Sequence, residues 1–116
     1  MTAFHAQLSN AEKQVLTVQK TVRSLGFSYF TGNMNVVRGL HEGTLGAIPT
    51  GAQAALIQPQ TNGIKYRSDS GAAAGLATAG FKLAADASIY FDGDLTAFRM
   101  IEQTASAVVC VEFFGE

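Results

Sequence analysis

A central stretch of the 116-residue chain, residues 48–70, constrains the fold more than any other. Two β-like runs, residues 52–58 and 64–68, flank a turn that contains Asn62 and Gly63. Asn-Gly supplies the two positive-φ residues that a tight hairpin turn needs, and Pro59 suits a strand end because it has no N–H to donate. The stretch therefore predicts a β-hairpin.

The composition favours a single folded domain that associates with other chains. Hydrophobic residues make up 47% of the sequence, which is enough for a core, but charged residues make up only 15%. So few charges protect a monomer poorly against association, and we expect a homo-oligomer. The net charge of -1 favours neither nucleic acid nor an acidic membrane surface as a partner. No apolar run is long enough to span a membrane, no secretory signal is visible, and a lone Cys110 allows no internal disulfide.

A helix is predicted near the N-terminus, over residues 10–25. Ser9 and Glu12 form a capping-box pattern, and Gly26 stands where a helix would end. Apolar residues between them recur at spacings of three and four: Leu8, Ala11, Val15, Val18, Val22 and Leu25. This stripe packs either on the chain's own sheet or on a neighbouring subunit. For the second case the candidate interface residues are Val15, Val18, Val22 and Leu25.

The rest of the chain has the pattern of a small all-β domain. Short β-like runs are separated by turn signals at about ten-residue intervals. Besides the two runs of the predicted hairpin, the β-like runs are residues 36–40, 81–83, 88–91, 97–103 and 106–114. Residues 71–80 are predicted to be a loop. We expect a mainly β protein: six or seven strands in a small antiparallel β-sandwich, jelly-roll-like, with an N-terminal helical arm. Residues 1–35 would form the arm and residues 36–116 the sandwich.

The final strand is apolar on both of its faces. Val109, Val111 and Phe113 are predicted to face the core, together with Ile89, Phe91 and either Leu56 or Ile57. The opposite face carries Val108, Cys110 and Phe114, interrupted by Glu112. Because a strand that is apolar on both faces is covered on both, these three residues are further interface candidates. Their cover would be the N-terminal helix or another subunit.

Few residues suggest chemistry, and we expect no catalytic, cofactor-binding or metal-binding residues. His5 and His41 are far apart and lack ligand-spaced partners. Cys110 lies among apolar neighbours, as a buried structural thiol does, and Asp92-Gly93-Asp94 reads as a β-turn rather than a calcium loop. Lys65, Arg67 and Asp69 alternate on one strand face, which is either solvated or an interface.

Three segments together resemble small structural proteins of tailed bacteriophages. They are IPTGAQAALIQPQ, IKYRSDSG and GFKLAADASIYFDGDLTAFRMIE, followed by the hydrophobic final strand, and the resemblance covers residues 46–114. It departs from the phage pattern in the predicted helix and at residues 85–88, where Ala-Asp-Ala-Ser replaces a glycine turn. The resemblance implies a β-sandwich in the virion, assembled in the bacterial host cytoplasm. It implies as partners the major capsid protein or other virion proteins, and a trimer as the favoured oligomer.

The leading functional hypothesis is therefore a non-enzymatic capsid decoration (cement) protein that binds and stabilises the phage shell. The alternative is a glycan- or receptor-binding β-sandwich of a phage tail or adhesin, with Tyr66 and Tyr90 as the aromatic residues that contact sugar. A small hydrolase or cupin-type enzyme is disfavoured, because the sequence offers no cluster of histidines and acids.

Overall fold

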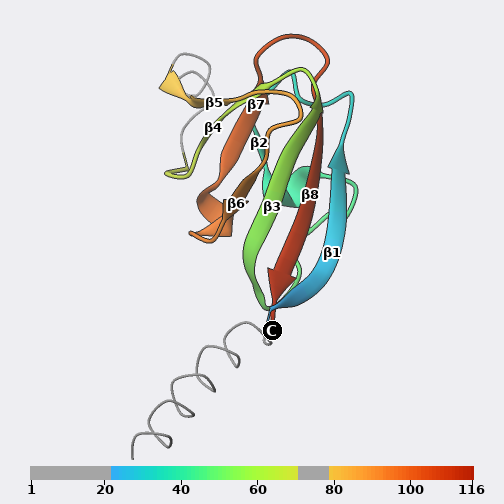
Figure 1. Ribbon diagram of the computed structural model, residues 1–116, viewed down its shortest axis with the longest axis vertical. Coiled ribbons are helices and arrows are strands. Elements are labelled where there is room, and N and C mark those ends of the chain that lie inside the picture. Colours follow the sequence, from blue (N-terminus) through green and yellow to red (C-terminus); the bar gives the residue numbers. More distant parts are fainter. Residues whose placement is uncertain (1–21, 71–78) are drawn as a thin grey trace, which may run out of the picture.

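The computed structural model describes residues 22–70 and 79–116, which form two four-stranded antiparallel sheets (Figure 1). The strands are β1 (Arg23–Phe30), β2 (Arg38–Gly39), β3 (Ala52–Thr61), β4 (Ile64–Arg67), β5 (Phe81–Leu83), β6 (Ile89–Phe91), β7 (Arg99–Glu102) and β8 (Val108–Gly115). Two short 3-10 helices, η1 (Leu40–Glu42) and η2 (Leu95–Ala97), precede β3 and β7. The prediction of a mainly β, antiparallel fold is confirmed, and the described residues form eight strands rather than six or seven.

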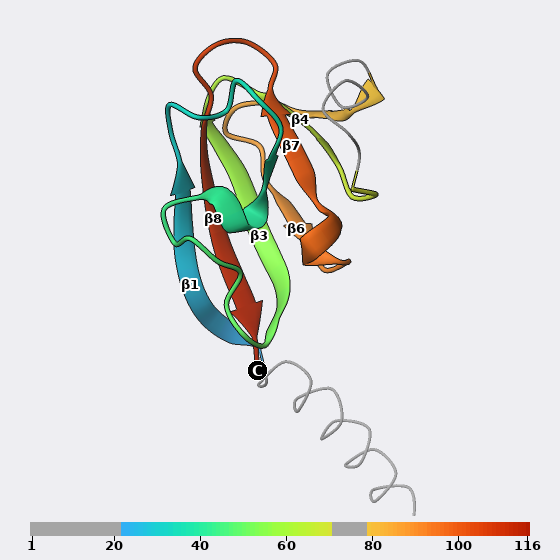
Figure 2. The same cartoon turned by 180° about the vertical axis from the view of Figure 1, so that it is seen from behind.

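The chain passes from one sheet to the other at almost every connection. The first sheet has the order β1-β8-β3-β6, and the second has the order β2-β7-β4-β5. Only β4 and β5 are consecutive neighbours in one sheet. Figure 1 shows the first sheet with β1, β8 and β3 side by side, and Figure 2 shows the molecule from behind, with η1 in front of these strands.

The predicted β-hairpin at residues 52–68 is wrong, although both of its strands exist. β3 pairs with β6 and β8, whereas β4 pairs with β5 and β7, so the turn between β3 and β4 joins two different sheets. Asn62 has the expected positive φ of 58°. Its side-chain amide donates to the Ala105 carbonyl oxygen at 2.7 Å, and the Gln103 amide donates to the Gly63 carbonyl oxygen at 2.9 Å. The turn is thus held by the loop that precedes β8 and not by a hairpin ladder.

The C-terminal end of the predicted helix is also wrong. Residues 23–25 belong to β1, which pairs along its length with β8, from Arg23 opposite Gly115 to Phe30 opposite Val109. Gly26 is no helix cap but lies at a register shift in this ladder. Residues 10–21 of the predicted helix, among them Val15 and Val18, lie outside the described residues.

The core lies between the sheets and draws on both. The final strand contributes Val109, Val111 and Phe113, each 0% exposed, so its predicted inward face is confirmed. Ile57 rather than Leu56 points inward, and Ile89 and Phe91 pack against the core as predicted. The remaining buried members are Phe30, Met34, Leu40, Ala55, Ile64, Leu83, Leu95, Phe98, Met100 and Ala107.

A row of aromatic rings connects the two sheets at one end of this core. Tyr66 of β4 stacks on Phe98 with centroids 5.4 Å apart, and Phe98 contacts Phe91 of β6 at 5.2 Å. Aromatic pairs at such distances contribute beyond the area that they bury. Phe81 of β5 extends the row, because its ring lies 5.8 Å from that of Tyr66.

The predicted strand at residues 36–40 is reduced to β2, because the chain turns into η1 at Leu40. The end of η1 lies close against β1. A side chain at Gly43 would collide with the hydroxyl of Ser28 and the ring of Phe30, so this close approach requires glycine. The buried Ser28 hydroxyl accepts a hydrogen bond from the Leu45 amide at 3.3 Å, which ties the segment after η1 to the sheet.

Candidate interaction surfaces

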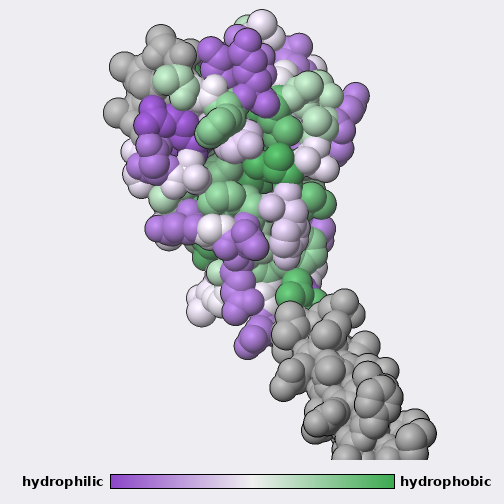
Figure 3. Space-filling view, turned by 60° about the vertical axis from the view of Figure 1, so that its left-hand side comes forward, coloured by the Kyte–Doolittle hydropathy of each residue, from purple (hydrophilic) through white to green (hydrophobic). Residues whose placement is uncertain are grey.

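The outer side of the β1-β8-β3-β6 sheet carries large apolar side chains beside polar ones such as Gln58 and Glu112. Since successive residues of a strand point to opposite sides, the residues between the buried positions of β1, β3, β6 and β8 face outward. We call six of these outward residues the aromatic face: Phe27, Leu56, Tyr90, Cys110, Glu112 and Phe114. Figure 3, which turns the side with β6 forward, shows apolar surface in the middle of the described part, bordered by polar residues.

One row of this face crosses all four strands. Phe27 lies opposite Glu112, Glu112 lies opposite Leu56, and Leu56 lies opposite Tyr90. Phe27 is 55% exposed, Tyr90 is 54% exposed and Leu56 is 37% exposed. The Tyr90 ring also lies 5.9 Å from that of Phe114. Large side chains left half in water on a continuous row are typical of a surface that another molecule covers.

A shallow groove runs along the centre of the aromatic face. It has a volume of about 240 Å³ and is lined by Phe27, Leu56, Gln58, Gln60, Cys110, Val111 and Glu112. Pockets that enclose small molecules are usually larger, from about 300 to 1,000 Å³. The groove suits one or two side chains of a partner better than a whole cofactor.

Glu112 is the charged residue within the row. Its carboxylate accepts a hydrogen bond from the Ser24 hydroxyl at 2.8 Å. A partner that covers the row must supply a donor or a cation to this carboxylate, because burying an unpaired charge costs several kcal/mol. Two copies related by a twofold axis at Glu112 would instead bring two carboxylates together.

Cys110 lines the groove and is half-buried rather than fully buried as predicted. Burial raises the pKa of its thiol, so the uncharged form predominates at neutral pH. Thiol nucleophiles have lowered pKa values, and the environment of Cys110 therefore agrees with a structural role.

The sequence-predicted interface residues fall into three groups. Val108, Cys110 and Phe114 share the outward side of β8, as predicted. Val22 is 42% exposed, whereas Leu25 packs partly against the core. Val15 and Val18 lie outside the described residues. The contribution of these residues to an interface stays a prediction.

Sequence reasoning missed Phe27 and did not assign Leu56 to the aromatic face. Phe27 was assigned to the N-terminal arm, because the helix prediction hid the alternation of β1. Leu56 and Ile57 were indistinguishable, since both are apolar and the strand register was unknown. The alternation of Phe27 and Tyr29 with the buried Ser28 and Phe30 was the signal that could have revealed the first of these.

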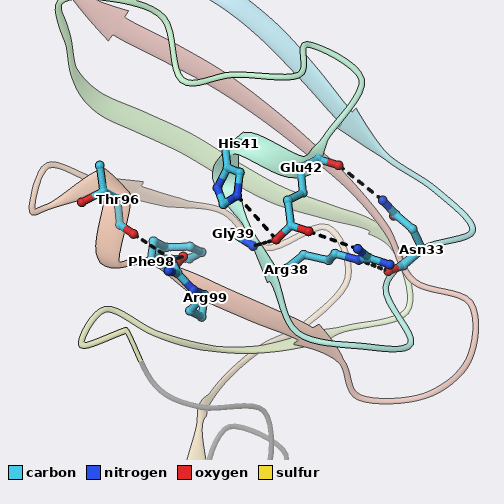
Figure 4. Close-up of polar contacts among 8 residues, drawn as sticks. All are labelled: Asn33, Arg38, Gly39, His41, Glu42, Thr96, Phe98 and Arg99. Carbon is cyan, nitrogen blue, oxygen red and sulfur yellow. Dashed lines mark hydrogen bonds and ion pairs between the residues drawn. The ribbon is translucent and has the colours of Figure 1, made fainter.

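A second candidate site is a cluster of charged and polar side chains around η1 (Figure 4). Arg38 donates to Glu42 at 3.1 Å and to the Asn33 carbonyl oxygen at 2.6 Å. The other Glu42 oxygen accepts from the Gly39 amide at 2.9 Å, and His41 lies 3.9 Å from it. The Gly39 hydrogen bond is the largest influence that lowers the pKa of Glu42, and Arg38 and His41 add to it. The cluster satisfies its own charges and thus fixes η1 to β2.

The predicted turn at Asp92-Gly93-Asp94 starts η2 and shows no feature of a cation site. Asp94 accepts hydrogen bonds from the amide and the hydroxyl of Thr96, at 3.0 and 2.6 Å. These bonds lower the pKa of the Asp94 carboxyl and cap the first turn of the 3-10 helix. Across residues 22–70 and 79–116, no three His, Cys, Asp or Glu side chains are grouped as metal ligands would be. In the same residues no helix is long and apolar enough to cross a membrane.

The outer side of the β2-β7-β4-β5 sheet differs from the aromatic face. We call its cationic residues Lys65, Arg67, Lys82 and Arg99 the basic face. Arg67 donates from Nε to Asp69 at 3.0 Å and from Nη2 to the second oxygen of the same carboxylate. The predicted common face of Lys65 and Arg67 is therefore observed, and β5 and β7 extend it.

Comparison with known proteins gave no match to a protein-family model, to a curated protein or to a solved structure.

Proposed function

We propose that this chain is a non-enzymatic structural protein of a bacteriophage particle, a capsid decoration (cement) protein that attaches to the shell through its aromatic face. The observation that carries the proposal is the row from Phe27 to Tyr90, which leaves large apolar side chains half in water on β1, β3 and β6, with Glu112 of β8 between them. Removing such a row from water on docking would contribute about 25 cal/mol per Å² of apolar area. The resemblance of residues 46–114 to phage structural proteins is the reason for proposing that the chain belongs to a phage particle.

We propose a jelly-roll β-sandwich as the finer description of its fold. The support is the strand order: eight strands are divided as β1-β8-β3-β6 and β2-β7-β4-β5, and the chain alternates between the sheets. This interleaving is the one that two nested Greek keys produce. Jelly rolls of this kind occur in viral capsid proteins and in lectins, so the fold agrees with both functions under discussion.

In the proposed assembly the partner is the major capsid protein or another virion protein, and the chain itself forms a homo-oligomer, with a trimer favoured. The position of Glu112 in the middle of the row supports a partner surface different from the aromatic face itself. A twofold dimer through this face would place the Glu112 carboxylates of the two copies next to each other. A cyclic trimer or attachment to a shell protein does not bring these two carboxylates together.

The second candidate is a glycan-binding module, and one observation favours it. The groove combines aromatic and amide side chains with a carboxylate, and Tyr90 remains accessible on the same sheet. Sugars are recognised by such a mixture of stacking surfaces and hydrogen-bonding groups. Tyr66, the other predicted sugar contact, stacks on Phe98 and packs against the core, so it takes no part in this candidate.

Sedimentation with DNA-free heads of a tailed phage that encodes this chain tests the proposal, with a glycan array run in parallel. We expect the wild-type chain to sediment with the heads and to bind no glycan. The double variant Phe27→Thr/Tyr90→Thr should lose at least about tenfold in affinity, because interface energy concentrates in buried aromatic anchors. Val36→Thr is the matched control, since Val36 is 46% exposed and lies outside both sheets.

Two results would contradict the proposal. Absence of sedimentation together with binding of a defined glycan would favour the second candidate. Equal affinity of the wild-type chain and the double variant for the heads, with both folded, would remove the aromatic face as the site of attachment.

A further inference from the structure

Asn62 and Gly63 form a dipeptide whose two residues can react with each other. Asparagine is a thermolabile residue, because the backbone nitrogen of the next residue can attack its side-chain carbonyl carbon, Cγ. The attack forms the bond from nitrogen to Cγ, breaks the bond from Cγ to Nδ2 and releases ammonia, which carries away the proton of the attacking amide. Water then opens the resulting succinimide ring at either carbonyl and leaves aspartate or isoaspartate. Glycine favours ring closure, since it has no side chain to crowd the attacking nitrogen, and Asn62 is the only asparagine of the sequence that glycine follows.

The structure places this dipeptide where the chain crosses between the two sheets. It joins β3 to β4, at the end of the molecule opposite the C-terminus (Figure 1). Nδ2 of Asn62 donates to the Ala105 carbonyl oxygen at 2.7 Å, and the Gly63 carbonyl oxygen accepts from the Gln103 amide at 2.9 Å. Both contacts restrict the rotations that bring the Gly63 nitrogen onto Cγ of Asn62. We therefore expect the reaction to proceed mainly from a transiently opened turn.

The reaction removes the contact with Ala105. Nδ2 is both the donor of that hydrogen bond and the atom that leaves as ammonia. The aspartate product carries a carboxylate instead, which only accepts hydrogen bonds and would face a second acceptor. Isoaspartate also adds a methylene group to the backbone of the turn, next to the hydrogen bonds that Gln103 donates to Gly63 and Ile64. In either product the crossover loses a contact with the loop before β8, the strand that pairs with both β1 and β3.

We propose that Asn62-Gly63 is a modification site, at which the native turn slows a spontaneous deamidation that loosens the crossover between the sheets once it occurs. The inference does not depend on attachment to a phage shell, because neither residue belongs to the aromatic face. Asp92-Gly93 is a related aspartate-glycine pair, but it has no side-chain amide to lose. A change of mass therefore distinguishes the reaction at Asn62 from any rearrangement at Asp92.

Mass spectrometry of protease-digested samples tests whether the site reacts. The full chain is held at a mildly alkaline pH and one temperature, either folded in buffer or unfolded in guanidinium chloride. We expect the peptide that contains Asn62 to gain the mass that accompanies replacement of –NH2 by –OH. Its rate of conversion should be at least about tenfold higher in the unfolded chain than in the folded one, because the native contacts of the turn must open first.

Melting temperatures of two variants test the consequence for the fold. Asn62→Asp reproduces the aspartate product and should lower the melting temperature by about 4 °C or more, because it replaces a hydrogen bond with two facing acceptors. Asn35→Asp is the matched control, since it makes the same change of charge at an exposed asparagine. It should shift the melting temperature by less than about 1 °C.

Three results would overturn the inference: no gain of mass at Asn62 in the unfolded chain, equal rates in the folded and unfolded chains, or equal melting temperatures of Asn62→Asp and Asn35→Asp. Failure of Asn62→Asp to fold while Asn35→Asp folds would support the inference, because it is the extreme form of the expected loss of stability.

Discussion

The two sheets of this protein share one core but present opposite surfaces. The outer side of β1-β8-β3-β6 is a row of half-exposed apolar side chains with one carboxylate, whereas the outer side of β2-β7-β4-β5 carries four cations. Neither surface is what folding alone favours, since the first leaves apolar area in water and the second places like charges opposite each other. The difference teaches that the two outer surfaces of one domain can differ in chemistry while their inner sides share a core.

The polar cluster at η1 shows what a surface with only a structural role looks like. Arg38, Glu42 and the Gly39 amide satisfy one another within the chain. The apolar side chains of the aromatic face have no such complement on their row, whereas on the basic face Arg67 is held by Asp69 and Arg99 by two carbonyl oxygens. Charges that are paired within the fold stabilise it, whereas half-exposed apolar side chains on a row are typical of a surface that another molecule covers.

The largest expected effect separates the two sides of β8. Phe113 is fully buried between the sheets, so Phe113→Ala should lower the free energy of unfolding by about 3–5 kcal/mol. Phe114 is its neighbour on the aromatic face and only half-buried, so Phe114→Ala should cost about 1 kcal/mol. Urea unfolding of both variants measures the difference. Equal losses would mean that the aromatic face is as much a part of the core as the inner side is.

An intermediate effect is expected at the polar cluster. Glu42→Gln should lower the free energy of unfolding by about 1–2 kcal/mol at neutral pH, because it weakens a charge-assisted hydrogen bond to the Gly39 amide and the pair with Arg38. The pKa of Glu42 is lowered from its ordinary value of 4.5 in the folded chain. Its stabilising contribution is therefore complete above that value and is lost as the pH falls through the lower, folded pKa.

Unfolding at neutral and at acidic pH provides the control for this prediction. The wild-type chain and Glu42→Gln should differ at neutral pH and converge once Glu42 is protonated in the folded chain. A difference that stays constant with pH would show that the substitution acts through packing and not through charge.

The smallest effect concerns the basic face. Lys82→Gln removes the cation opposite Lys65 and should raise the free energy of unfolding by a few tenths of a kcal/mol, or about the size of one unfavourable cross-strand pair. The gain should shrink as salt is added, because salt screens the repulsion that the substitution relieves. Differential scanning calorimetry at low and high salt measures it. A clear loss of stability at low salt would contradict repulsion on this face.

The sequence predicted well those features that depend on local alternation. The inward face of β8, with Val109, Val111 and Phe113, followed from apolar residues at every second position, and strands β5 and β6 followed from short runs between turn residues. In these cases the strand's own pattern contains the information, whichever strands are its neighbours.

The errors arose where pairing between distant segments decides the structure. Asn62-Gly63 is a hairpin signal, yet β3 pairs with β8, about fifty residues away, and the turn became a crossover between the sheets. Residues 23–25 continued a helical spacing, yet their backbone pairs with β8. Local propensity is overridden when a long apolar strand such as β8 offers hydrogen bonds on both of its edges. Cys110 and Phe114 of the aromatic face were predicted from the sequence, but the row across four strands could not be, since it exists only in the assembled sheet.

The most direct test of attachment through the aromatic face uses Cys110, which lines its groove and is the chain's only cysteine. The rate of its alkylation by a small maleimide should be measured for the free chain, for the chain bound to DNA-free phage heads, and for the urea-unfolded chain as the reference. Cover of the groove by the shell predicts a rate at least about tenfold slower on the heads than in the free chain, because a docked interface excludes reagent and water from its centre. An unchanged rate on heads that carry the bound chain would contradict attachment through this face.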